Sequence, residues 1–295
     1  MNTLKKILGI SALLLLSSCA SKPPKENVQA ERQDDGKAIE LEFTTKFYDA
    51  VDKWVAFGKK GDSAYGIVGF IYIDEEAGFT LNTELTLDTE VEDVVVKYRL
   101  GRNTADVAIL PDKEIERLGL PKVPDWLEIY KANENKNSYL VQMGYFYNHV
   151  GASHNAIEPL LKAYNKEPHF KRLEFELAYA YNATKDFDKA IAVLNKAIEN
   201  DSKNYLLYKE LGFSFIHKDK LDEAEKAYLQ GIELITEESQ KVIAAEMAIN
   251  MANSYFQTKN KPKFEKWAEL TKKYAEEDSI FYYYINRFEE NWDKD

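Results

Sequence analysis

The 34 residues from Lys171 to Asn204 read KRLEFELAYAYNATKDFDKAIAVLNKAIENDSKN. Apolar residues recur at helical spacing in both halves of this stretch, which indicates two amphipathic helices. The stretch therefore predicts one helix–turn–helix unit, and the same pattern extends along the chain in both directions.

Blocks of the same length begin at Asn137 and at Tyr205, with no insertion between the three blocks. Large apolar or aromatic residues occupy positions 7, 11 and 24 of every block, and small residues occupy positions 8 and 20. The small residues are Gly144, Ala178 and Gly212 at position 8, and Ala156, Ala190 and Ala224 at position 20. Small residues allow two antiparallel helices to approach closely, and the large residues fill the space around the crossing.

This period and its residues resemble the tetratricopeptide repeat (TPR), whose helix pairs stack into a solenoid. A fourth, divergent unit follows, with Met251, Ala252 and Tyr255 at the equivalent spacing after a long connection from Glu237 to Ala245. Beyond it, one face of a final helix is expected to cover the last repeat with Ile280, Phe281, Tyr284, Ile285, Phe288 and Trp292. The aromatic run FYYY in this helix leaves a binding patch open as the alternative.

The first twenty residues have the layout of an export signal. Two lysines precede an apolar run of ten residues, and small residues follow it. The run is about 15 Å long as a helix, too short to cross a bilayer core of about 30 Å. The stretch LSSC, which ends at Cys19, resembles the lipobox of bacterial lipoproteins. The resemblance implies cleavage before Cys19 and acylation of its thiol, and the alternative is an ordinary signal peptide with a cysteine nearby.

The residues after Cys19 predict a tether and a location. ASKPPKENVQAERQDDGK, from Ala20 to Lys37, contains almost nothing to bury, so we expect a solvated tether. In the sorting pattern of Gram-negative lipoproteins, Ala20 favours the outer membrane. The absence of an acidic pair in SKPPKE favours the side that faces the periplasm. Cys19 is the only cysteine, so no disulfide is expected.

The net charge of the chain limits the classes of partner that it can bind. The formal net charge is −11, and removal of Lys5 and Lys6 with the signal takes it to −13 (−11 − 2). A chain this acidic repels nucleic acid and anionic lipid surfaces. We therefore expect the lipid anchor, rather than a basic face, to hold the protein at the membrane.

Between the tether and the repeats, the hydrophobic period changes from helical to alternating. GFTLNTELTLD predicts a half-buried strand, and GIVGFIYI with the turn DEEAG before it predicts a hairpin. VVVKYRL and DVAIL are further strand candidates, and PDKEIERLGLP reads as a short helix. FYDAVDKWVAFG fits a helix and a strand equally well.

The predicted fold class is an α+β N-terminal domain followed by an all-α TPR solenoid. The expected segments are a signal peptide (1–18), a lipidated tether (19–37), a small β-rich domain (38–130), a solenoid of about four repeats (131–278) and a C-terminal capping helix (279–295).

No arrangement of residues predicts catalysis. The sequence contains no Gly-x-Ser-x-Gly elbow, no phosphate-binding glycine loop and no His-Glu-x-x-His zinc motif. His149 and His154 are the closest histidine pair, and the sequence places no third metal ligand near them. We therefore predict no enzyme, metal or cofactor. The alternative is that the β-rich domain is an enzyme or a small-ligand module, with the repeats as a docking arm.

The resemblance implies that the first helices of successive repeats line a concave groove. The positions that face such a groove are Val141, Phe175 and Lys209 (position 5), Tyr145, Tyr179 and Phe213 (position 9), and Asn148, Asn182 and Ile216 (position 12). Aromatic rings offer large contact areas and asparagines bond to peptide backbones, so the predicted partner is an unidentified envelope protein or peptide. The groove lacks the paired Lys and Arg with which some members clamp a C-terminal carboxylate. The same aromatics would also suit packing between repeats, and the sequence leaves both roles open.

Overall fold

The computed structural model describes residues 42–57, 63–66, 69–74, 78–81, 102–117, 120–123 and 127–294. The chain divides into two compact units, Met1–Pro124 and Asp125–Asp295. The boundary expected from the sequence, after residue 130, lies slightly beyond this division. The predicted signal peptide, Cys19, the tether and the strand candidate VVVKYRL all lie outside the described residues.

One three-stranded antiparallel sheet of the N-terminal unit has the order β1-β6-β2, with β1 at Thr45–Lys46, β2 at Val55–Phe57 and β6 at Asp106–Ile109. The strand predicted from DVAIL is therefore confirmed as β6. The segment that fitted helix and strand alike forms a short 3₁₀ turn, Phe47–Asp49, and then β2. Phe47, Trp54 and Val107 are buried, and the indole Nε1 of Trp54 donates a hydrogen bond to the carbonyl of Pro121 at 2.8 Å.

A second antiparallel sheet has the order β3-β4-β5, with β3 at Ser63–Gly66, β4 at Gly69–Asp74 and β5 at Gly78–Leu81. The predicted hairpin is confirmed, because β4 pairs with β5 in a register that joins Asp74 to Gly78. Within GIVGFIYI, β4 begins at Gly69, and β3, which ends at Gly66, pairs antiparallel with β4 on its other side. The predicted short helix is confirmed as α1, Asp112–Arg117.

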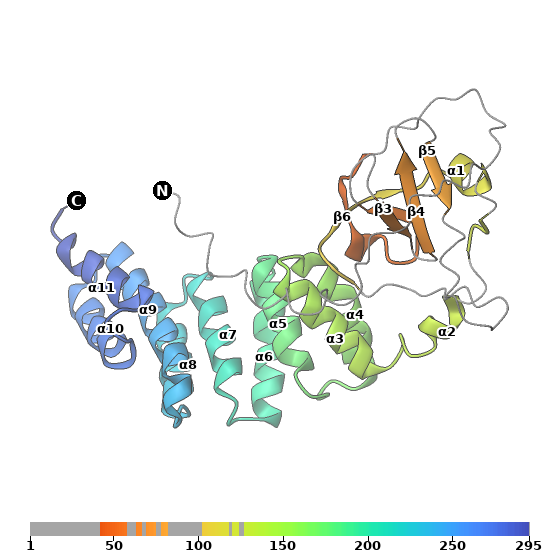
Figure 1. The fold of residues 1–295 in the computed structure, drawn as a ribbon. Coiled ribbons are helices and arrows are strands. Elements are labelled where there is room, and N and C mark those ends of the chain that lie inside the picture. The colour runs from red at the N-terminus through yellow and green to blue at the C-terminus, as the bar shows by residue number, and fades with distance from the viewer. Residues whose placement is uncertain are drawn as a thin grey trace. The chain divides into compact units, whose positions relative to one another are not determined.

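The C-terminal unit is helical throughout its described length (Figure 1). A short helix, α2, precedes helix pairs that stack in sequence order, and a single helix follows them. The bounds are α2 Leu127–Lys131, α3 Asn137–His149, α4 Ser153–Lys166, α5 Leu173–Ala183, α6 Phe187–Asn200, α7 Tyr205–Ile216, α8 Leu221–Glu233, α9 Lys241–Gln257, α10 Lys261–Tyr274 and α11 Ile280–Glu290.

The repeating small and large residues pack as their spacing predicts. Ala156, Ala190 and Ala224 are fully buried, as are Leu160 and Leu194. Gly144 and Gly212 lie against the side chains of Leu160 and Tyr228, which occupy the space that a Cβ would need. The glycine at position 8 thus sets how closely the two helices of the first and third pairs approach, whereas the second pair has Ala178 there.

Each helix pair turns through a residue with left-handed backbone conformation. The φ angles at position 15 are 79° at Gly151, 66° at Lys185, 57° at Asp219 and 53° at Lys259. Glycine adopts this conformation readily, whereas a residue with a Cβ is disfavoured there by about 1–2 kcal/mol. Only the first of these four turns therefore uses the residue best suited to it.

The fourth pair and the last helix depart from the expected pattern in detail. The long connection is largely helical, because α9 begins at Lys241 after a 3₁₀ turn at Glu238–Gln240. Helix α11 covers the end of the stack as predicted, with Ile285 buried. The covering surface is narrower than predicted, since Ile280 and Tyr284 are exposed.

Aromatic stacking joins the end of the chain to the fourth pair. Trp292 stacks on Phe264 with ring centroids 4.6 Å apart, and Phe288 stacks on Phe256 at 5.0 Å. Across the described part of the chain, every helix is too short or too polar to traverse a bilayer.

Candidate functional site

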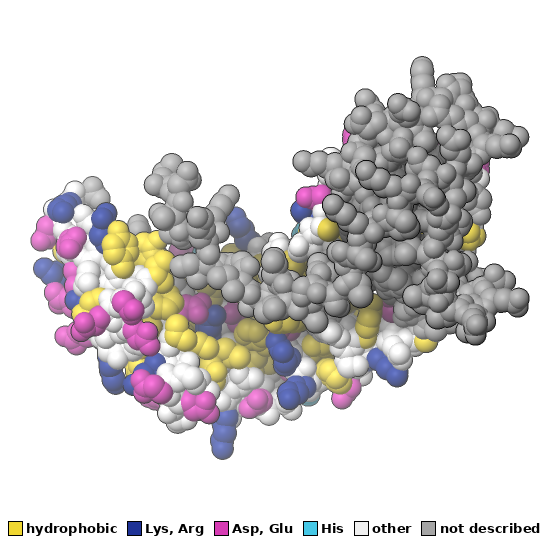
Figure 2. Space-filling model, in the orientation of Figure 1, with side chains coloured by type: hydrophobic (Ala, Val, Ile, Leu, Met, Phe, Trp, Pro, Cys, Tyr) yellow, Lys and Arg dark blue, Asp and Glu magenta, His cyan; other side chains and the backbone are white. Residues whose placement is uncertain are grey.

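The first helices of successive pairs pack directly on one another, α3 on α5, α5 on α7 and α7 on α9. The aromatic residues that the sequence assigned to a groove, Tyr145, Tyr179 and Phe213, lie on these first helices. Figure 2 shows hydrophobic side chains along the visible face of the helical unit, with charged side chains around its edge. An apolar surface that runs along several helices suits an extended peptide.

Two tyrosines stand out on this surface. Tyr145 is 43% exposed and Tyr179 is 38% exposed, which is high for large aromatic side chains in a packed solenoid. The ring of Phe175 lies 6.5 Å from that of Tyr179, and the guanidinium of Arg172 lies 4.7 Å above that of Tyr145. The predicted aromatic row is therefore accessible at its first two members.

The third aromatic residue of the row, Phe213, is less exposed than the first two. Phe213 is half-buried, and its ring lies 4.4 Å from that of His217, which in turn stacks on Phe187 at 4.9 Å. Ile216 is half-buried and packs against the hydrophobic cluster of the fourth pair. At this end, the aromatics serve packing between repeats as well as the surface.

The two asparagines predicted to bind a peptide backbone do not face the groove. Asn148 and Asn182 are only 6% and 5% exposed. The amide of Asn148 donates to the carbonyl and carboxylate oxygens of Glu176, at 2.9 and 3.0 Å. Asn182 does the same to Glu210, at 3.1 and 3.0 Å. The prediction is wrong for both residues because the next first helix lies close enough to use their donors.

Lys209 lies among carboxylates rather than free in the groove. Its ammonium is 2.9 Å from Glu246 and 3.8 Å from Glu210. Burial alone would lower the pKa of Lys209, but these two carboxylates raise it above the ordinary value. Burial raises the pKa of Glu210, against the opposing effects of Lys209 and Asn182. Lys209 is therefore a charged residue of this surface, and the carboxylates of Glu246 and Glu210 balance its charge.

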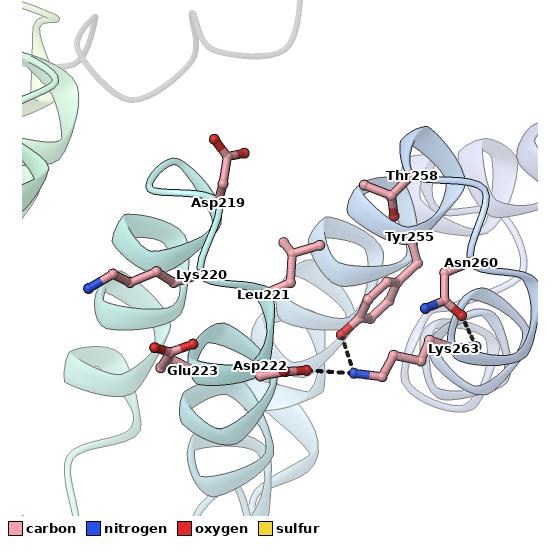
Figure 3. A pocket seen from close by; sticks show the side chains of 9 residues that line it. All are labelled: Asp219, Lys220, Leu221, Asp222, Glu223, Tyr255, Thr258, Asn260 and Lys263. Atoms are coloured by element: carbon pink, nitrogen blue, oxygen red, sulfur yellow. Dashed lines mark hydrogen bonds and ion pairs between the residues drawn. The ribbon is translucent and has the colours of Figure 1, made fainter.

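A polar pocket lies at the turn edge of the third and fourth pairs (Figure 3). It has a volume of about 450 Å³ and is lined by Asp219, Lys220, Leu221, Asp222, Glu223, Tyr255, Thr258, Asn260 and Lys263. Lys263 reaches across it to Asp222 at 2.8 Å and to the Tyr255 hydroxyl at 3.2 Å. The ammonium of Lys263 and the carboxylate of Asp222 thus take part in the contacts that join α8, α9 and α10. Among the described residues, no three His, Cys, Asp or Glu side chains are grouped to hold a metal ion.

Sequence reasoning missed the glutamates of the Asn–Glu pairs and the contact of Arg172 with Tyr145. A signal for the first was present, because an asparagine is followed 28 residues later by a glutamate in two successive repeats. No periodic signal marks Arg172, because its role depends on an unusual backbone angle.

The profile of the tetratricopeptide repeat family matches residues 175–204. Among solved structures, the chain is similar to a crystal structure of MamA, with 20% identity over 58% of this chain and 88% of that one and a TM-score of 0.42. It is also similar to MamA 41-end from Desulfovibrio magneticus RS-1 (15% identity, 57% and 83% covered, TM-score 0.41). A third is the first TPR domain of human RPAP3, solved by NMR (24% identity, 40% and 94% covered, TM-score 0.35).

The comparison with curated proteins finds no match. The matched repeat lies in the second of the helix pairs, and its neighbours repeat the same period, packing and turn geometry. The helical unit therefore stacks its helix pairs in a TPR-like arrangement, and one of these pairs contains the repeat that the family profile matches.

Proposed function

We propose that this protein is a lipid-anchored adaptor of the bacterial cell envelope that binds a partner protein through the face of its first helices. The exposed row of Tyr145 and Tyr179, continued by the half-buried Phe213, is the observation that carries the binding role. Exposed aromatics on a rigid scaffold offer large contact areas with little loss of side-chain entropy, and such residues dominate binding energies.

The anchoring part of the proposal rests on Cys19 and the residues around it. Acyl chains on this thiol would hold the protein at the outer membrane on its periplasmic side, and residues 20–37 would separate the folded units from the lipid. Two or more chains suffice for stable attachment, since each buried methylene contributes about 0.8 kcal/mol.

The binding role is tested by crosslinking and capture in the native bacterium. The tagged full chain is compared with a Tyr145→Ala, Tyr179→Ala, Phe213→Ala variant, and bound proteins are identified by mass spectrometry. A Tyr283→Ala, Tyr284→Ala variant is the control, because these exposed aromatics lie on α11, the last helix, outside the row formed by Tyr145, Tyr179 and Phe213.

A partner that the parent and the control capture, and the groove variant does not, supports the proposal. The groove variant must retain the circular dichroism and melting behaviour of the parent. Equal capture by all three proteins would show that the first-helix face is not the binding surface.

A further inference from the structure

A second pocket opens beside Tyr145, between α3 and the segment that leads into α5. We call it the α3/α5 pocket. Its volume is about 270 Å³, and its lining residues are Ser138, Val141, Gln142, Tyr145, Phe170, Lys171 and Arg172. The four residues from α3 recur at helical spacing and share one face, so the pocket is part of the first-helix surface.

The lining combines apolar walls with a basic mouth. Val141, Tyr145 and Phe170 supply apolar surface, and Lys171 and Arg172 are the charged residues. No carboxylate lines the pocket. Lys171 is exposed and forms no ion pair with any described residue, whereas Arg172 contacts Glu176 at 3.1 Å. Of the two cations that line the pocket, Arg172 is thus paired with one carboxylate and Lys171 with none among the described residues.

Arg172 is held in an unusual backbone conformation. Its φ angle is 70°, in the left-handed region that disfavours a residue with a Cβ. The other non-glycine residues with positive φ in the described chain all lie in turns within helix pairs, whereas Arg172 lies between two pairs. Its guanidinium lies 4.7 Å from the centroid of the Tyr145 ring, over the face of the ring. Strained backbone of this kind is concentrated at binding sites.

The local charge opposes the charge of the whole chain. The chain carries a net charge of −11, yet the mouth of this pocket has an excess cation. At physiological salt, charges more than about 8–10 Å away are largely screened, so a carboxylate at the mouth is attracted despite the acidic chain. The ligand group that complements this pocket is thus acidic at one end and apolar at the other.

We propose that the α3/α5 pocket receives an apolar side chain of the bound partner, next to an aspartate or glutamate whose carboxylate binds Lys171 and Arg172. The volume lies below the roughly 300–1,000 Å³ of pockets that enclose whole small ligands, so it suits one side chain. This inference rests on the proposed function, because it names the chemistry of the segment that lies on the first-helix face.

The test is a selection from a library of random 12-residue peptides on the purified full chain. The expected enrichment is Leu, Ile, Met or Phe beside Asp or Glu. A Lys171→Gln, Arg172→Gln variant is expected to bind the enriched peptides at least tenfold more weakly and to lose the acidic preference in a repeated selection. A Ser138→Trp variant, which fills the pocket and keeps both cations, is expected to lose the apolar preference instead.

A Lys196→Gln, Lys226→Gln variant is the matched control. It removes the same charge from exposed positions on the second helices α6 and α8, and it is expected to bind like the parent. Binding by the Lys171 and Arg172 variant that equals this control, or enrichment without acidic residues, would overturn the inference.

The outcomes of the selection also show whether the pocket assignment fails alone or together with the proposed function. If peptides are enriched without an acidic preference and a Tyr179→Ala, Phe213→Ala variant loses them, the face binds peptides but the pocket assignment is wrong. If the parent enriches no peptide at all, the inference fails together with the peptide-binding role of the face.

Discussion

At Gly212, the ring of Tyr228 fills the space where the Cβ of any other residue would lie. Tyr228 is fully buried. In Gly212→Ala, better helix propensity would contribute up to about 1 kcal/mol, but overpacking of a close helix contact costs about 1–3 kcal/mol. We expect a net loss of about 1–2 kcal/mol in the free energy of unfolding, measured by urea denaturation. A variant as stable as the parent would show that this contact is not tight.

Asn182 is central to the hydrogen bonds between the second and third pairs. It donates to two oxygens of Glu210 and accepts a hydrogen bond from the Ser214 hydroxyl at 2.7 Å. Asn182→Ala leaves these buried groups without their partner, and we expect a loss of about 2–4 kcal/mol in the free energy of unfolding. The exposed Asn195→Ala serves as the control and should change stability by less than about 0.5 kcal/mol.

At the scale of elements, the left-handed turn residue links the two helices of each pair. Gly151 has no atoms near the place of a Cβ, so the effect of Gly151→Ala is confined to the backbone. We expect this variant to lose about 1 kcal/mol in the free energy of unfolding and Lys185→Gly to gain about 0.5–1 kcal/mol, because glycine relieves the left-handed strain. Denaturation curves test both, and changes of the same sign in the two variants would contradict the explanation.

Another element-scale prediction concerns Glu225, which joins α8 to α9 and α10. Its carboxylate is 2.8 Å from Lys266, 3.0 Å from Lys263 and 3.0 Å from the Tyr255 hydroxyl. Burial alone would raise the pKa of Glu225, but hydrogen bonds from these partners outweigh it and lower the pKa to about 2. Since an unfolded glutamate titrates near 4.3, the ionised group stabilises the fold above about pH 4.5, and this stability is lost as the pH falls towards 2.

Glu225→Gln should therefore destabilise the protein at pH 7 more than at pH 3. The measurement is the difference in urea midpoint between parent and variant at the two pH values. The exposed Glu223→Gln, on the same helix, is the control. A difference that stays constant with pH would show that the carboxylate charge does not join these helices.

At the scale of the whole molecule, the proposed lipid anchor at Cys19 would decide where the protein works. In the native bacterium, Cys19→Ser should abolish incorporation of a palmitate analogue and move the protein from the membrane fraction to the soluble envelope fraction. The reason is that no acyl chain remains to be buried in lipid. A parent chain that takes up no label would contradict the lipobox prediction, and residues 20–295 should fold alike in both chains.

The sequence by itself determined the repeat architecture, because a 34-residue period of small and large residues encodes the packing of neighbours that are close along the chain. The hairpin of β4 and β5 could also be predicted from the sequence, because its two strands are neighbours along the chain. The sequence left Tyr145 and Tyr179 with two possible roles, in a groove or in packing between repeats, and the structure leaves both side chains exposed.

Only the tertiary structure decided the roles that depend on the distance between repeats. Asn148 and Asn182 changed from groove donors to buried partners of Glu176 and Glu210, because the next first helix lies within hydrogen-bond distance. The α3/α5 pocket is lined in part by Arg172, whose left-handed backbone no residue pattern marks. Periodicity reports which face of a helix is apolar, whereas the position of a side chain across an interface follows from helix crossing and backbone angles.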